Sequence, residues 1–210
     1  MPDLSFEVDG AAAVPFCESP LLAFRLRVAN RSGEPIHSIM LRCQIMIETT
    51  RRSYTAEERP KLADLFGYPE QWKQTLHGML WTISTVLVPA FSDTTVTDLP
   101  VPCTFDFNVA ATKYFGGLEG GEVPLCLLFS GTVFYQTSAS GLQVAQIPWD
   151  RQAEYRLPVR LWRELMDMYY PNTAWLCLER DVFERLRQFR TQHALATWDQ
   201  ALDMLLPKNP

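Results

Sequence analysis

The sequence predicts an α+β protein that is mainly β: an antiparallel β-sandwich, immunoglobulin-like or C2-like, with a helical insertion and a C-terminal helical segment. About seven to nine short runs with strand-like alternation precede residue 160, and turns separate them without the strand–helix rhythm of a parallel sheet. Apolar residues adopt helical spacing only in the insertion and after residue 158. A barrel made of the same strands is the main alternative.

The clearest strands span residues 21–30 and 37–48, on either side of a turn. Their apolar residues alternate with polar or less apolar ones, and the apolar sets are Leu22, Phe24, Leu26 and Val28, then Ile39, Leu41, Cys43, Ile45 and Ile47. We expect these two strands to pair antiparallel at the heart of the sheet, with Arg42 and Gln44 facing water. A weaker strand at residues 4–8 precedes them.

Residues 51–79 interrupt the β pattern and predict a helical insertion over an edge or end of the sheet. Glu57 and Glu58 lie in the first turn of one plausible helix. Pro69 occupies a favoured first helical position, and a second short helix can follow to Met79.

Strand signals then resume. The predicted strands cover residues 80–88, 96–101, 104–115, 123–135, 142–147 and 155–159. Pro100 and Pro102 suit an edge strand, because proline cannot donate a hydrogen bond to a neighbour. Phe105, Phe107 and Val109 alternate within the third of these runs. The glycine-rich stretch at 116–121 is expected to be a hairpin loop.

The C-terminal part changes character. We predict a sandwich domain over residues 1–158 and a helical or β-α-α segment over 159–210 that packs on it or forms a homodimer. A helix should end before Pro171, a short strand follows, and a Thr197–Gln200 capping box opens the last helix. The β-α-α order loosely resembles a ribbon-helix-helix module. Its strand would present Trp175, Cys177 and Glu179 outward, and these residues read DNA poorly.

Composition excludes several classes of protein. Of 210 residues, 47% are hydrophobic and 12% aromatic, which supplies a core and excludes a disordered chain. The 19 basic and 24 acidic residues give a net charge of −5, unlike a generic nucleic-acid binder. Apolar runs of about six residues are too short to span a membrane. The five cysteines lack paired spacing, and the first residues lack a signal-peptide pattern, so we expect a cytoplasmic protein with reduced thiols.

No chemistry-bearing motif emerges, so we expect neither an enzyme nor a catalytic, cofactor or metal site. His37, His77 and His193 are far apart and lack metal-ligand spacing. The glycine-rich stretch lacks a phosphate-binding lysine after its glycines. Ser130 lacks the surroundings of a nucleophile elbow, and a Cys103 thiolate would need a base that the sequence does not identify.

Aromatic residues form the most suggestive set, because Tyr and Trp are enriched at protein interfaces. The candidate partner surface consists of Tyr68, Trp72, Trp149, Tyr169, Tyr170 and Trp175. The alternative is that these side chains fasten the helical segments to the sandwich.

Several segments resemble an uncharacterised bacterial family, a domain of unknown function that is common in actinobacteria. The resemblance covers nearly the whole chain, and its segments are Leu41–Ile45, Asp64–Gly67, Leu128–Tyr135, Ile147–Trp149 and Tyr169–Asn172. The resemblance implies that the gene for this protein lies beside the genes for actinobacterial-type nickel–iron hydrogenases and their maturation factors. It therefore implies an accessory or assembly role, and the family has no assigned active site.

We therefore expect a non-enzymatic interaction protein that binds another protein, with a hydrogenase subunit or maturation factor as the candidate partner. The alternative is a small-ligand binder or enzyme with a pocket between the 51–79 insertion and the sandwich. A deep polar pocket gathering His77, Cys103 and an acid would favour the enzyme, and a flat apolar patch would favour the binding protein.

Overall fold

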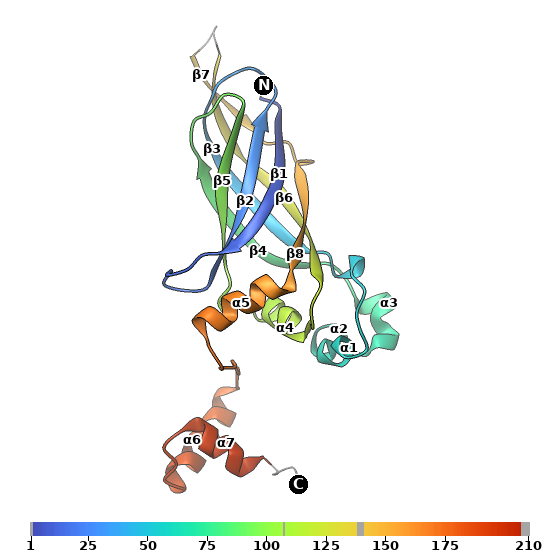
Figure 1. Ribbon diagram of the computed structural model, residues 1–210, viewed down its shortest axis with the longest axis vertical. Helices are drawn as coiled ribbons and strands as arrows, with labels where there is room; N and C mark the ends of the chain where they lie inside the picture. The colour runs from blue at the N-terminus through green and yellow to red at the C-terminus, as the bar shows by residue number, and fades with distance from the viewer. Residues whose placement is uncertain (1, 107, 138–140, 207–210) are drawn as a thin grey trace. The chain divides into compact units, whose positions relative to one another are not determined.

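The computed structural model describes residues 2–106, 108–137 and 141–206, and it divides into two units, Met1–Asn172 and Thr173–Pro210 (Figure 1). The first unit contains two antiparallel sheets that pack face to face, with short helices after several strands. The predicted mainly β, α+β class is confirmed. Among the described residues, no helix combines the length and apolarity needed to cross a membrane.

The smaller sheet has the strand order β1-β2-β5. Its strands are β1 (Leu4–Ala13), β2 (Leu21–Asn30) and β5 (Thr94–Pro102). The proline-bearing strand β5 lies at an edge, as its composition predicts.

The larger sheet has the order β4-β3-β6-β7, and β8 also pairs with β6. Its strands are β3 (Ile36–Ile47), β4 (Met79–Val88), β6 (Glu122–Thr137), β7 (Gly141–Gln146) and β8 (Gln152–Pro158). Strand β6 is its longest member. Strand β3 pairs with one side of β6. On the other side of β6, its first part pairs with β8 and its last part pairs with β7.

The predicted pairing of strands 21–30 and 37–48 is wrong, although the predicted burial of their residues is right. Ile39, Leu41, Ile45 and Ile47 are buried, but β2 and β3 belong to opposite sheets. The Asn30 side chain helps to hold the crossing between them by donating to the carbonyls of Glu34 (2.7 Å) and Ser92 (2.9 Å). One apolar face per strand specifies what is buried. It does not specify whether two such strands lie side by side or face to face.

Aromatic contacts join the two sheets across the core. Phe6 of β1 stacks on Phe129 of β6 with ring centroids 4.3 Å apart. The Phe24 ring of β2 meets Trp81 of β4 and Tyr155 of β8 edge-on, at 6.1 and 5.7 Å. Such pairs contribute about 0.5–1.5 kcal/mol each beyond the area that they bury.

The strand predicted at 104–115 is also wrong, because the chain forms helix α4 (Val109–Gly117) there. The Asn108 side chain caps this helix by accepting a hydrogen bond from the amide of Ala111 at 2.9 Å. Ala111, Tyr114 and Phe115 are buried with helical spacing. Gly116 and Gly117 therefore end a helix and do not frame a hairpin loop. Phe107, part of the alternation that predicted a strand, lies outside the described residues.

The insertion is helical, as predicted, but its helices are single turns, and the second predicted helix ends at Thr75 and does not reach Met79, which begins β4. These single turns are the 3-10 turns η1 (Thr49–Arg51) and η2 (Pro69–Gln71) and the helices α1 (Glu58–Lys61), α2 (Ala63–Phe66) and α3 (Trp72–Thr75). Pro69 occupies the first position of its turn.

The division between the units falls after Asn172, whereas the sequence placed a boundary after residue 158. Helix α5 (Val159–Tyr169) therefore belongs to the first unit, where Trp162 stacks on Phe115 with ring centroids 5.4 Å apart.

The second unit contains α6 (Arg180–Gln192) and α7 (Trp198–Leu205). The predicted capping box between Thr197 and Gln200 is present. Residues 174–179 form no strand, so the sequence prediction of a β-α-α segment is wrong in its β part. A ribbon-helix-helix module requires that strand, so the resemblance to such a module is also wrong.

Candidate interaction surface

The outer face of the larger sheet exposes apolar side chains on several strands. Alternate residues of a strand point to opposite faces, so those that miss the core form this outer face. Its exposed apolar members, which we call the apolar outer face, are Met40, Leu80, Ile83, Leu87, Leu142 and Val144. Apolar residues scattered singly need no explanation, but a patch that continues across strands does.

The strand register makes this face continuous. Met40 of β3 lies opposite Leu87 on β4 and opposite Thr132 on β6. Two residues further along β6, the half-buried Phe134 lies opposite Val144 of β7. Met40 and Phe134 are diagonal neighbours across β3 and β6, within reach of long and aromatic side chains, so the apolar surface extends from β4 across the sheet to β7.

A groove of about 620 Å³ crosses this face, with Arg42 in its lining. Its lining residues are Met40, Leu41, Arg42, Thr85, Val86, Leu87, Gly131 and Thr132. Arg42 has no acidic partner among the described residues, and its neighbours across the ladders are Thr85 and Ser130. The groove therefore presents one unpaired positive charge within an apolar surround.

The six aromatic residues predicted as a partner surface come from separate segments. Tyr68 and Trp149 are 71% and 93% exposed, and they stay candidates for contact with a partner. Trp175 is 56% exposed and belongs to the second unit.

The other three candidates support local structure. The Trp72 indole donates to the carbonyl of Gly67 at 3.0 Å. The Tyr169 hydroxyl accepts from the Cys17 amide at 2.9 Å, and the Tyr170 ring packs on Phe105 with centroids 5.0 Å apart. For Tyr169 and Tyr170 the fastening role that the sequence left open has direct support, whereas the Trp72 bond stays within the insertion.

The histidines and cysteines do not assemble into a reactive group. His77 and His193 are exposed, and each contacts a nearby carbonyl of its own segment, at 2.6 and 2.9 Å. Burial raises the pKa of the Cys43 and Cys103 thiols to about 12, which keeps them protonated near neutrality. Over residues 2–106, 108–137 and 141–206, no three His, Cys, Asp or Glu side chains are grouped as metal ligands would be.

We expect the purified protein to carry no stoichiometric metal, because its His, Cys and acidic residues are dispersed. Elemental analysis by plasma mass spectrometry should find far less than one zinc, nickel or iron per chain. About one equivalent that survives dialysis against a chelator would contradict this expectation.

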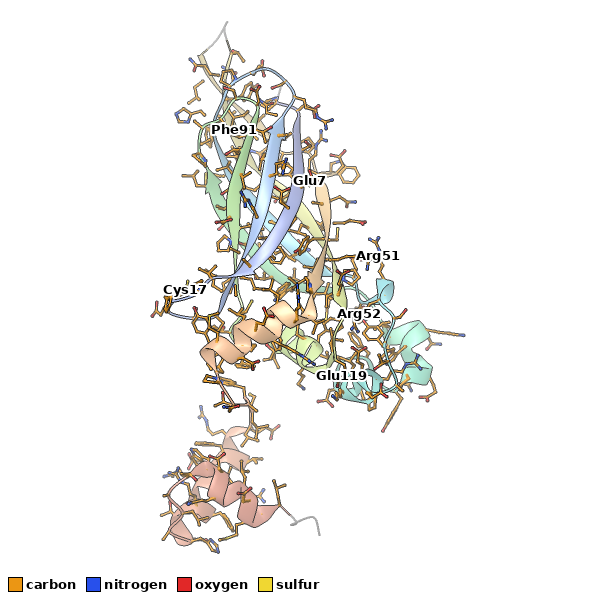
Figure 2. The ribbon with its side chains drawn as sticks, in the orientation of Figure 1. Glu7, Cys17, Arg51, Arg52, Phe91 and Glu119 are labelled. Carbon is orange, nitrogen blue, oxygen red and sulfur yellow. The ribbon has the colours of Figure 1, made fainter. Side chains whose placement is uncertain are left out.

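A buried ion pair within the insertion, Arg52–Glu58, also contacts the start of β6 through Arg52, which is labelled in Figure 2. The side chains of Arg52 and Glu58 are only 8% and 1% exposed, and two hydrogen bonds of 2.9 and 2.8 Å link them. Arg52 also donates to the carbonyls of Gly120 and Glu122, at 2.6 and 3.2 Å. The amide of Glu119 in turn donates to Glu58 at 2.8 Å.

The electrostatics of Glu58 follow from these contacts. Burial alone would raise the pKa of this carboxyl group. The hydrogen bonds from Arg52 and from the amides of Glu119 and Thr55 outweigh burial and hold the pKa at about 2, below its ordinary value of 4.5. Glu58 is therefore a charged structural anchor and not a proton donor near neutral pH.

Aromatic residues fill the space beside this ion pair. The hydroxyl groups of Tyr54 and Tyr114 lie 2.9 Å apart, and the guanidinium of Arg52 lies 5.1 Å from the centre of the Tyr54 ring. Paired side chains thus fill this part of the junction between the insertion and the sandwich, and a hollow of about 280 Å³ remains between Arg51 and strands β6 and β8.

Comparison with known proteins identifies a family for this chain but no function. A family model described as a family of unknown function, DUF6084, matches residues 1–210. No curated protein matches the chain.

Several solved structures show a distant likeness to this chain. A late embryogenesis abundant (LEA) protein is 15% identical over 75% of this chain and 72% of its own, with a TM-score of 0.34. A CARDB domain from Pyrococcus furiosus is 13% identical over 75% of this chain and 92% of its own, with a TM-score of 0.28. A β-glucosidase from Kluyveromyces marxianus is 9% identical over 74% of this chain and 15% of its own, with a TM-score of 0.30. Likenesses this remote do not bear on function.

Proposed function

We infer that this chain, which belongs to the DUF6084 family of unknown function, acts as a non-enzymatic protein-interaction or assembly accessory protein. The observation that carries this inference is the apolar outer face of the larger sheet. Single-chain proteins seldom leave a continuous apolar patch in water, and such patches commonly mark interaction sites.

The chemistry of the partner follows from the groove in that face. Met40 and Leu87, which are 60% and 66% exposed, favour an apolar segment such as one face of a helix or the edge of a sheet. The unpaired Arg42 favours an acidic side chain within that segment, because burying the guanidinium without a partner would weaken binding. We propose a partner segment that is apolar with one acidic group.

The identity of the partner rests on the family resemblance and not on any residue of the groove. We propose a subunit or maturation factor of a nickel–iron hydrogenase in bacteria, mainly actinobacteria, with the complex in the cytoplasm. The five free cysteines accord with a reducing compartment. In this role the chain docks on a protein and does not carry nickel itself.

Replacing Leu87 by Glu should weaken binding to the partner at least tenfold, because the new charge would be buried in the interface. The measurement is affinity purification from the native host with mass spectrometry, followed by titration of purified hydrogenase subunits and maturation factors against the chain.

The matched control is Val96→Glu, which places the same charge at a 44% exposed apolar position on the other sheet. Binding should survive this substitution. Equal loss with both variants, or no loss with either, would contradict docking on the apolar outer face. A partner unrelated to hydrogenases that depends on Leu87 would overturn only the proposed identity.

The alternative function, a small-ligand binder or enzyme with a pocket between the insertion and the sandwich, has less support. The Arg52–Glu58 pair and the Tyr54–Tyr114 contact occupy part of that junction, and the hollow beside Arg51 contains neither His77 nor Cys103. Cys103 is buried near the end of β5, whereas His77 lies exposed before β4. A small molecule that protects residues 51–79 from hydrogen exchange would favour this alternative.

A further inference from the structure

We propose that the second unit binds the same unit of a second copy of the chain, with α6 of each copy against α7 of the other. The proposal concerns only the two helices and is independent of the apolar outer face. It rests on a missing core, a preformed groove and a complementary charge pattern.

The unit is too small to bury its own apolar residues. Among its described residues only Ala201 is fully buried. Leu205 and Leu206 are 52% and 62% exposed, and Val182 is 42% exposed. Helices of 13 and 8 residues gain most of their stability from tertiary packing, so an isolated pair with one buried alanine is incomplete.

The two helices hold each other in a defined arrangement and leave a groove open. The rings of Phe183 and Trp198 lie 5.3 Å apart, and the guanidinium of Arg190 lies 4.0 Å from the centre of the Trp198 ring. A groove of about 390 Å³ is lined by Leu186, Phe189 and other residues of α6, together with Leu205 of α7. Its apolar floor is ready to receive apolar side chains from outside.

Charge identifies the occupant. Helix α6 contains four arginines against two acidic residues, a net charge of +2, whereas α7 contains two aspartates and no basic residue, a net charge of −2. Laying α6 on the α6 of another copy would bring like charges together. A two-fold arrangement that sets α6 against the other copy's α7 matches the charges at both contacts, and a two-fold interface is the commonest in homodimers.

The size of the face predicts a modest affinity. Helix α6 is roughly 20 Å long, and two helices packed side by side are roughly 20 Å wide, so each copy buries on the order of 400 Å². This is about half of the area per partner in a standard stable interface. We therefore expect a dimer whose population rises with concentration and not a permanent one.

Sedimentation velocity of the full chain over a wide concentration range tests the dimer. The unaltered chain of 24.1 kDa should shift toward twice that mass as its concentration rises. Leu205→Glu should raise the dissociation constant of the dimer at least tenfold. Leu87→Glu, an equally drastic change at an exposed leucine on the sheet, should leave the dissociation constant unchanged.

A charge exchange distinguishes α6–α7 pairing from any other dimer. Arg185→Glu and Asp203→Arg should each weaken self-association, because the first cancels the net positive charge of α6 and the second cancels the net negative charge of α7. An equimolar mixture of the two variants should dimerise more strongly than either variant alone, since their heterodimer keeps one contact between an unaltered α6 and an unaltered α7. Far-UV circular dichroism confirms that the helices of each variant remain formed.

Three outcomes would overturn the proposal. The first is that the chain stays monomeric at the highest concentration. The second is that Leu205→Glu and Leu87→Glu reduce the dimer equally. The third is that the mixture of the two charge variants forms no more dimer than either variant alone. Failure to bind a hydrogenase subunit, or to dock through Leu87, would contradict the proposed function but not the dimer. The two proposals can therefore be tested independently.

Discussion

Replacing Glu58 by Gln is expected to lower the free energy of unfolding by about 3–5 kcal/mol, the range for breaking a buried ion pair by removing one partner. Glutamine keeps the shape of the side chain but removes its charge. The guanidinium of Arg52, whose side chain is 8% exposed, would then lie buried without a counter-charge. Urea denaturation followed by tryptophan fluorescence measures the difference.

The matched control is Glu154→Gln, which removes the acid of the exposed Arg51–Glu154 pair. Surface pairs contribute only about 0–1 kcal/mol, so this variant should stay close to the unaltered protein. A similar loss in both variants would show that the buried pair has no special role.

The effect of Glu58 should also depend on pH. Its pKa in the folded protein, about 2, lies below the ordinary value of 4.5, so the unfolded chain binds a proton here more readily than the folded one. The stabilisation is complete above pH 4.5 and declines as pH falls toward 2. The difference in stability between the unaltered protein and the Glu58→Gln variant should therefore shrink across that interval. A difference that stays constant would contradict the assigned cause.

Replacing Gly131 by Ala is expected to destabilise the fold by at least about 3 kcal/mol or to prevent folding. Gly131 has φ +139°, a conformation that L side chains rarely adopt, and an added Cβ would lie 2.0 Å from the carbonyl oxygen of Met40. That oxygen belongs to the backbone of β3, so it cannot move without disturbing the central ladder. Strain of this kind and a backbone clash add to one another.

Gly10→Ala provides the comparison, because an added Cβ on Gly10 meets nothing within 4 Å and its φ is not in the positive range. This change should be neutral or stabilising by up to about 1 kcal/mol. Thermal unfolding of both variants separates the general cost of losing a strand glycine from the clash at Gly131. Equal midpoints would show that β3 and β6 can separate at little cost.

The sequence predicted most strands of this fold but not how the strands are distributed between the sheets. Alternation identified the buried residues of 21–30 and 37–48, because burial depends on each strand alone. Sheet membership depends on the crossing that Asn30 helps to hold, and no local pattern reports it. The alternation of Phe105, Phe107 and Val109 predicts a strand where helix α4 begins, and the capping residue Asn108 is a weaker signal for that helix.

The alternation pattern does not predict the apolar outer face, for a related reason. Alternation predicts one buried face for each strand, and it places Met40 on the less apolar side of its strand. Strand β4 carried the missing signal, because Ile83 and Leu87 lie opposite in phase to the buried Val88. Apolar residues on both faces of a strand predict either burial between two layers or a surface that another molecule covers.

The position of β6 in the chain has a consequence for synthesis of the protein. Leu41 of β3 pairs with Gly131 of β6, so the partner of β3 leaves the ribosome long after β3 itself. At about 5–20 residues per second, the 90 residues between these positions take roughly 5–20 s to make. During that delay β3 can pair only with β4, and one edge of the ladder stays open to neighbouring nascent chains. Slower elongation before residue 122 should therefore increase aggregation, whereas slower elongation after residue 158 should not.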